Sequence, residues 1–127
     1  MDIKIDSPIR VGMSLLEFDD RIPSIRFFVE LSVEKFEFSF SIKMSCWIEC
    51  AVLDTFVDML KRERVARMHD VNNDFSLVVD CENNRLLWSS VKRDVFGNAI
   101  NTGGEEALAN GATSKILQEF ESYPKWW

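Results

Sequence analysis

Alternation of apolar and polar residues over 25–33 and 35–47 is the feature that most constrains how this chain can fold. In "KFEFSFSIKMSCW" (35–47) the even-numbered positions, from Phe36 to Cys46, are all apolar, whereas all six odd-numbered positions before Trp47 are polar or charged. A period of two places successive side chains on opposite faces of a β-strand. In 25–33 the residues that share the apolar face are Phe27, Val29, Leu31 and Val33. We therefore predict two long strands that pair antiparallel and need a core on one face.

The period changes after Trp47. Over 48–63 the apolar residues recur at i, i+3, i+4 and i+7, as Leu53, Phe56, Val57 and Leu60. This spacing predicts an amphipathic helix. We expect its apolar stripe to cover the apolar face of 35–47. The residues that it would cover are Phe36, Phe38, Phe40 and Ile42.

The remaining segments complete the prediction of the fold. Strands are expected at 9–18, 74–81, 85–94 and, more weakly, 95–101. Asn83-Asn84 is expected to form a hairpin turn, because Asn tolerates positive φ. Thr102 and Glu105 have the spacing of a capping box, and a closing helix is expected at 112–121.

The predicted order is β-β-β-α-β-β-β-α, which indicates the α+β class. We expect a single antiparallel sheet of about five to seven strands, with both helices packed on one face. Residues 1–127 have the length of one domain.

Composition excludes several function classes. The net charge is −6 and the pI about 4.8, so phosphates would be repelled and nucleic acid is not expected as a direct partner. No apolar run approaches the roughly 18 residues of a membrane span. The start, "MDIKIDSPIR", contains no apolar signal-peptide core, so a cytoplasmic location with reduced cysteines is expected.

The chain contains little that could carry chemistry. His69 is the only histidine, and the three cysteines have no CxxC spacing, so neither a zinc site nor a cofactor is expected. No GxGxxG, Walker A or HExxH pattern occurs. We expect a protein that is not an enzyme. A carboxylate pair acting as acid and base remains an alternative, although 21 acidic residues would bring some pair together in any case.

The placement of charge is more informative. Residues 68–84 hold four acids and residues 11–20 hold three, and neither stretch contains Lys or Arg. Such a surface either faces water or receives a basic partner, and exposed Trp beside carboxylates is typical of binding hot spots. The residues predicted to bind a partner are Asp19, Asp20, Asp70, Asp74, Asp80, Glu82 and Trp88. Trp126 and Trp127, at the end of the chain, are a further apolar pair that could meet a partner.

From about residue 25 to 121 the chain resembles the WapI-like immunity family of bacterial polymorphic toxin and contact-dependent inhibition systems. The resemblance lies in an aromatic-rich β meander, a helix in "AVLDTFVDML" after Trp47, the hairpin-rich "NDFSLVVDCENNRLLWSSVKRDVFG" and the closing "TSKILQEF". It implies an intracellular immunity protein that binds and blocks a cognate toxin. That toxin is expected to be a basic nuclease domain. We expect the protein to be a monomer or a weak dimer. The resemblance assigns no site residue.

A small acidic secretion chaperone is the alternative. Such proteins are also cytosolic α+β domains, but they usually begin with a helix, whereas this chain begins with strands. The partner discriminates the two functions, because a chaperone binds an extended effector segment and an immunity protein binds a folded toxin domain.

Overall fold

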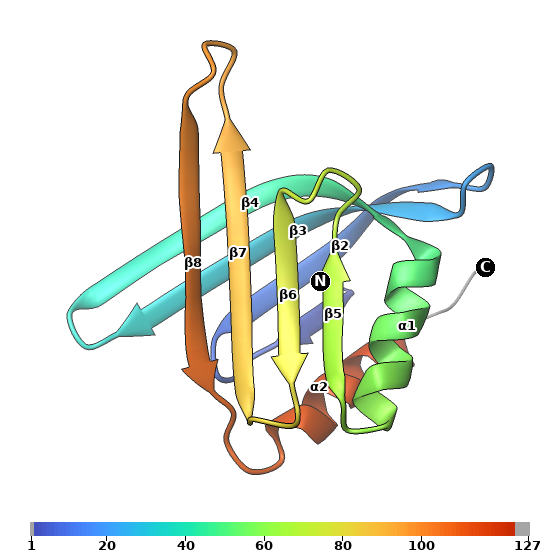
Figure 1. The fold of residues 1–127 in the computed structure, drawn as a ribbon, viewed down its shortest axis with the longest axis vertical. Coiled ribbons are helices and arrows are strands. Elements are labelled where there is room, and N and C mark those ends of the chain that lie inside the picture. Colours follow the sequence, from blue (N-terminus) through green and yellow to red (C-terminus); the bar gives the residue numbers. More distant parts are fainter. Residues whose placement is uncertain (1, 124–127) are drawn as a thin grey trace.

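The computed structural model describes residues 2–123 and contains two four-stranded antiparallel sheets and two helices (Figure 1). The first sheet has the order β1 (Ile3–Ile5), β2 (Arg10–Asp19), β3 (Ser24–Lys35) and β4 (Phe38–Glu49). The second has the order β5 (Val65–His69), β6 (Phe75–Asp80), β7 (Arg85–Arg93) and β8 (Ala99–Ala107). The helices are α1 (Cys50–Lys61), between the sheets in sequence, and α2 (Ala112–Ser122).

The α+β class is confirmed, but the prediction of a single sheet is wrong. Within each half of the chain every strand pairs with its sequence neighbour through a short connection. Between β4 and β5 the chain forms α1 instead, and β5 packs beside that helix rather than against β4. The helix therefore divides the strands into two sheets. Sequence periodicity did not reveal β1 or β5, which have only three and five residues.

The long hairpin of β3 and β4 forms as the alternation predicted. Its twelve residue pairs run from Ser24↔Glu49 to Lys35↔Phe38 without a register shift. The alternating apolar residues of β3 from Ile25 to Val33 are buried. A two-residue turn joins the strands, and Phe36 occupies the left-handed region there with a φ of 57°. That conformation is unfavourable for a bulky residue.

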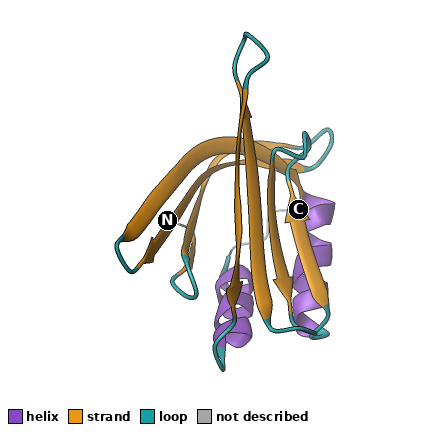
Figure 2. Ribbon diagram, turned by 60° about the vertical axis from the view of Figure 1, so that its left-hand side comes forward, coloured by secondary structure: helices purple, strands orange, loops and turns teal. Residues whose placement is uncertain are grey.

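The two sheets lie one against the other (Figure 2). Buried apolar residues from both sheets belong to one hydrophobic cluster. The Ser90 hydroxyl on β7 lies 3.7 Å from the Met44 sulfur on β4. The Val71 amide, just after β5, donates to the Trp47 carbonyl of β4 at 2.9 Å. The second sheet fills its side of the core with fully buried residues, among them Met68, Leu77, Val79 and Leu86.

The helices complete the core beside the sheets. The predicted stripe of α1 is buried at Leu53, Phe56 and Leu60. Helix α2 buries Ile116 and Phe120, and the Phe56 and Phe120 ring centroids are 4.9 Å apart. Helix α1 therefore packs against α2 and β5.

The expectation that α1 covers Phe36, Phe38, Phe40 and Ile42 is wrong. Phe36 is fully exposed and Phe38 is 63% exposed, whereas the other two are half-buried under the second sheet. The reason is length. A strand of twelve residues spans roughly 40 Å, and α1 begins at the end of β4 opposite to Phe38. A helix of twelve residues is about 18 Å long and does not reach back to the tip.

The capping-box prediction at Thr102 and Glu105 is also wrong, because both residues lie within β8. The two glycines between them are needed by their neighbour Trp88. A Cβ on Gly103 would lie 2.9 Å from the Trp88 carbonyl oxygen, and a Cβ on Gly104 would overlap the indole ring. Asn83-Asn84 does form a turn, with Asn84 at a φ of 55°.

Truncation of the α1 stripe tests the packing. Leu53→Ala or Phe56→Ala should lower the free energy of unfolding by about 2–5 kcal/mol, because each removes a buried side chain and leaves a cavity. Chemical denaturation measures the change. Thr55→Ala, at an exposed position of the same helix, is the control and should have an effect near zero. Equal small losses in all three variants would contradict the burial of the stripe.

Candidate partner-binding surface

The residues predicted to bind a partner lie at four places rather than in one patch. Asp19 and Asp20 are exposed at the β2–β3 turn. Asp70 and Asp74 belong to the β5–β6 connection, and Asp80 and Glu82 to the β6–β7 turn at the other end of the second sheet (Figure 1). Trp88 lies within β7. Acidic residues that are close in sequence therefore do not form one acidic face in the structure.

Asp70 is a structural turn residue. It is only 3% exposed, and its Oδ1 accepts hydrogen bonds from the Asp74 amide at 2.6 Å and the Phe75 amide at 2.9 Å. Its own amide donates to the Phe75 carbonyl at 3.1 Å. The Asp70 carboxylate thus supplies the hydrogen-bond acceptor for two backbone amides of the turn. Its predicted exposure is wrong, because the side chain turns inward to satisfy these amides.

Trp88 is also buried, at 6% exposure. It pairs with Leu77 on one side and Gly104 on the other, so its indole belongs to the inner face of the second sheet. Ser90, two residues further on, shares that inner face and is buried too. In β7 the buried face carries Trp88 and Ser90, whereas apolar Leu87 and Val91 lie on the other face, so residue type does not reveal which face is buried. The expectation that Trp88 is exposed for partner binding is wrong.

Two further acids are held by local partners. Asp74 Oδ1 lies 2.6 Å from Arg93 Nη1. Asp80 accepts hydrogen bonds from the Asn83 side chain and from the amides of Asn83 and Glu82 at 2.9–3.1 Å. These bonds lower the pKa of Asp80, the Asn83 side chain being the largest cause. Both carboxylates therefore stabilise the connections in which they lie.

Asp19 and Asp20 instead belong to an exposed surface with apolar side chains. Ser24 of β3 pairs with Asp19 of β2 on one side and with Glu49 of β4 on the other. Asp19 and Glu49 therefore lie at the same end of the first sheet. Ile22, in the β2–β3 turn, is 68% exposed, and Val71 is 47% exposed. We call Asp19, Asp20, Ile22, Glu49 and Val71 the acidic corner.

Two contacts hold the acidic corner together. The Cys50 amide at the start of α1 donates to the Pro23 carbonyl at 2.8 Å, and this bond joins the β2–β3 turn to the end of β4. The bond from the Val71 amide to the Trp47 carbonyl adds the β5–β6 connection. Nearby, Arg26 is paired with Glu17 at 2.8 Å. The corner thus keeps three exposed acids against the single basic residue of the turn, Arg21.

Groups that often act as nucleophiles are poorly placed for it. Burial, with the charge of Asp70, raises the pKa of Cys46 to about 12, so the thiol stays protonated at neutral pH. His69 is exposed, and its Nδ1 lies 3.1 Å from the Asp70 carbonyl oxygen. Within residues 2–123 no group of three or more His, Cys, Asp or Glu could hold a metal ion.

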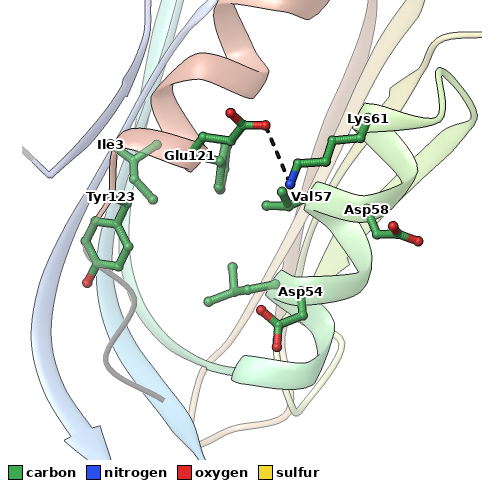
Figure 3. Close-up of a pocket in the computed structure, with 9 residues that line it drawn as sticks. Ile3, Asp54, Val57, Asp58, Lys61, Glu121 and Tyr123 are labelled. Atoms are coloured by element: carbon green, nitrogen blue, oxygen red, sulfur yellow. Dashed lines mark ion pairs between the residues drawn. The ribbon is translucent and has the colours of Figure 1, made fainter.

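A groove of about 630 Å³ lies between the two helices (Figure 3). Ile3, Leu53 and Phe120 contribute apolar surface to it, and Lys61 and Glu121 face each other across it at 3.7 Å. Sequence patterns did not predict this groove, because its walls combine α1 from the middle of the chain with residues near both ends.

Comparisons with family models, with curated proteins and with solved structures found no match. Neither helix in the part of the chain that the structure describes is long and apolar enough to cross a membrane. Trp126 and Trp127 lie outside the described residues.

Asp70 and Asp74 should respond differently to truncation. Asp70→Ala should lower the free energy of unfolding by about 1–3 kcal/mol, because two amides lose their acceptor. Asp74→Ala removes a partly exposed ion pair and should cost less than about 1 kcal/mol. Urea denaturation of both variants measures the difference. A smaller loss for Asp70→Ala would contradict its structural role.

The acid titration of Asp80 should follow its hydrogen bonds. Because its pKa lies below the ordinary value of 3.8, its contribution to stability is complete above that value and is lost as pH falls through the lower native pKa. NMR of the Asp80 carboxyl should therefore give a midpoint below 3.8, and Asn83→Ala should raise it. A midpoint at or above 3.8 in the unmodified protein would refute this interpretation.

Proposed function

We propose that this chain is a cytoplasmic immunity protein that neutralises a cognate bacterial toxin domain by binding it through the acidic corner. The observation that supports the proposal is the combination of exposed acids with exposed apolar residues there. Asp19, Asp20 and Glu49 are all exposed, although Asp19 Oδ1 also accepts the Arg21 amide at 2.9 Å. Among the other predicted acids, Asp70, Asp74 and Asp80 complete turns or an ion pair. The resemblance to WapI-like immunity proteins points to the same kind of partner.

Electrostatics explains why an acidic corner suits this task. A nuclease domain concentrates Lys and Arg because it binds phosphates. Carboxylates on the inhibitor attract such a domain before contact and raise the association rate. Ile22 and Val71 would supply apolar contact, which chiefly slows dissociation. Inhibition then needs no cofactor and no catalytic group.

A secretion chaperone is the second candidate. One observation favours it: β8 lies at the edge of its sheet and leaves one side open to an extended segment. A chaperone would bind an unfolded effector segment, whereas the acidic corner, built from three separate connections, suits a folded surface.

Charge reversal at the corner tests the proposed function. Asp19→Lys with Asp20→Lys should slow association with the cognate toxin domain by roughly tenfold or more at low salt, with a smaller effect at high salt. It should also weaken protection of cells that express the toxin. The matched control is Glu34→Lys with Glu63→Lys, which makes the same change in net charge at exposed sites elsewhere. Equal effects of the two pairs would show that only net charge matters.

The apolar part of the corner has its own test. Ile22→Ser should speed dissociation of the toxin domain several-fold and leave the association rate nearly unchanged, since apolar contacts act after encounter. Ile100→Ser is the control, because Ile100 on β8 is equally exposed, at 68%, and lies outside the corner. Surface plasmon resonance separates the two rates. If Ile100→Ser had the larger effect, docking would occur elsewhere.

A further inference from the structure

Strand β8 is an unprotected sheet edge. Its nine residues pair with β7 from Arg85↔Ala107 to Arg93↔Ala99 without a register shift, and no strand within residues 2–123 pairs with its other side. Such an edge presents free N–H and C=O groups to any extended chain. Proteins often protect long edges with charged side chains, Pro or a bulge, and "AINTGGEEA" has no Pro, no Lys and no bulge, its only charges being Glu105 and Glu106 at one end.

Below this edge the first sheet extends further than the second. The β3–β4 hairpin reaches beyond β8 in both views of the molecule (Figures 1 and 2). An ion pair of 2.8 Å between Lys35 Nζ and Glu106 Oε2 joins the end of β3 to β8. The tip of the hairpin therefore continues past the last strand of the second sheet.

The projecting part of the β3–β4 hairpin carries aromatic side chains on the face that is turned toward the second sheet. Phe38 pairs with Lys35, and paired residues share a face, so Phe38 points to the side on which β8 lies. The Phe38 and Phe40 rings meet edge to face, with centroids 5.7 Å apart. Phe38 remains 63% exposed because no strand of the second sheet lies above it. The result is an open strand edge above an apolar floor.

We infer that this β8 shelf, made of the β8 edge with Phe38 and Phe40, binds an extended segment of a partner protein as an added strand. The β8 backbone would supply main-chain hydrogen bonds, as in other strand-addition complexes. Neighbouring strands lie about 4.8 Å apart and stacked sheets about 10 Å apart, so the added strand would stand above the floor at an ordinary sheet spacing. Every second side chain would then contact the phenylalanines.

The surroundings define the chemistry of the segment. Glu106 is paired with Lys35, and Glu105 with Arg85 at 2.7 Å, so the carboxylates beside the edge are already neutralised. The shelf therefore favours an uncharged segment with apolar residues at alternate positions. Proline at its centre would remove a main-chain donor and obstruct pairing.

A second copy of this chain is the competing occupant of the edge, because pairing of β8 with itself would make the protein a dimer. Sedimentation equilibrium of the unmodified protein should therefore give a monomer, and a dimer that pairs through β8 would overturn the inference. The shelf also lies on the opposite side of the molecule from the β2–β3 turn, so it is independent of toxin binding at the acidic corner.

Selection from a displayed library of random nine-residue peptides tests the inference. Peptides enriched on the unmodified protein should alternate apolar and uncharged polar residues and lack a central proline. Phe38→Ser should weaken their binding roughly tenfold, because an exposed aromatic loses its contact with the peptide. The control is Phe96→Ser, which changes an even more exposed phenylalanine in the β7–β8 turn and should leave affinity unchanged.

Amide hydrogen exchange supplies a second measurement that does not depend on the variants. Binding of an enriched peptide should slow exchange of β8 amides that face the open edge, and inserting proline at the centre of the peptide should abolish both binding and protection. The inference is overturned if no peptide is enriched or if enriched peptides lack alternation. It is equally overturned if Phe38→Ser and Phe96→Ser have the same effect, or if β8 exchange does not change.

Discussion

The twelve-residue pairing of β3 with β4 sets the position of most other elements. At one end of this hairpin, the Cys50 amide bonds to the Pro23 carbonyl, and α1 begins there. At the other end, Lys35 binds Glu106 of the second sheet, and the tip continues past β8. The middle forms one wall of the core, because the apolar face of β3 is buried along its length. A hairpin longer than the sheet that covers it necessarily leaves part of its apolar face exposed.

Acidic residues serve two different purposes in this fold. Asp70 and Asp80 accept backbone amides within their turns, where a short carboxylate supplies the acceptor that the chain lacks. Asp94 does the same for Phe96 and Asn98 in the β7–β8 turn, and those bonds lower its pKa. Asp20 and Glu49 have no such role in the described contacts. The net charge of −6 therefore overstates the acidity that a partner would meet, because part of it serves turn geometry.

The two candidate surfaces differ in what they can recognise. The acidic corner combines charge with exposed Ile22 and Val71 from separate connections, and it suits a folded basic surface. The β8 shelf offers a row of backbone groups above two phenylalanine rings, and it suits an extended uncharged segment. Their opposite placement would let one molecule engage both kinds of partner without competition between them. Each surface also explains exposed apolar residues that would otherwise only raise the risk of aggregation.

The sequence by itself determined the local structure: the alternation in β3 and β4, the stripe of Leu53, Phe56 and Leu60, and the turn at Asn84. It also determined that the class is α+β. Only the tertiary structure decided that the strands form two sheets, that Phe38 lies in solvent, and that Asp70 and Trp88 are buried. The physical reason is that periodicity reports which side chains share a face, whereas burial depends on which distant segment covers that face and how far it extends.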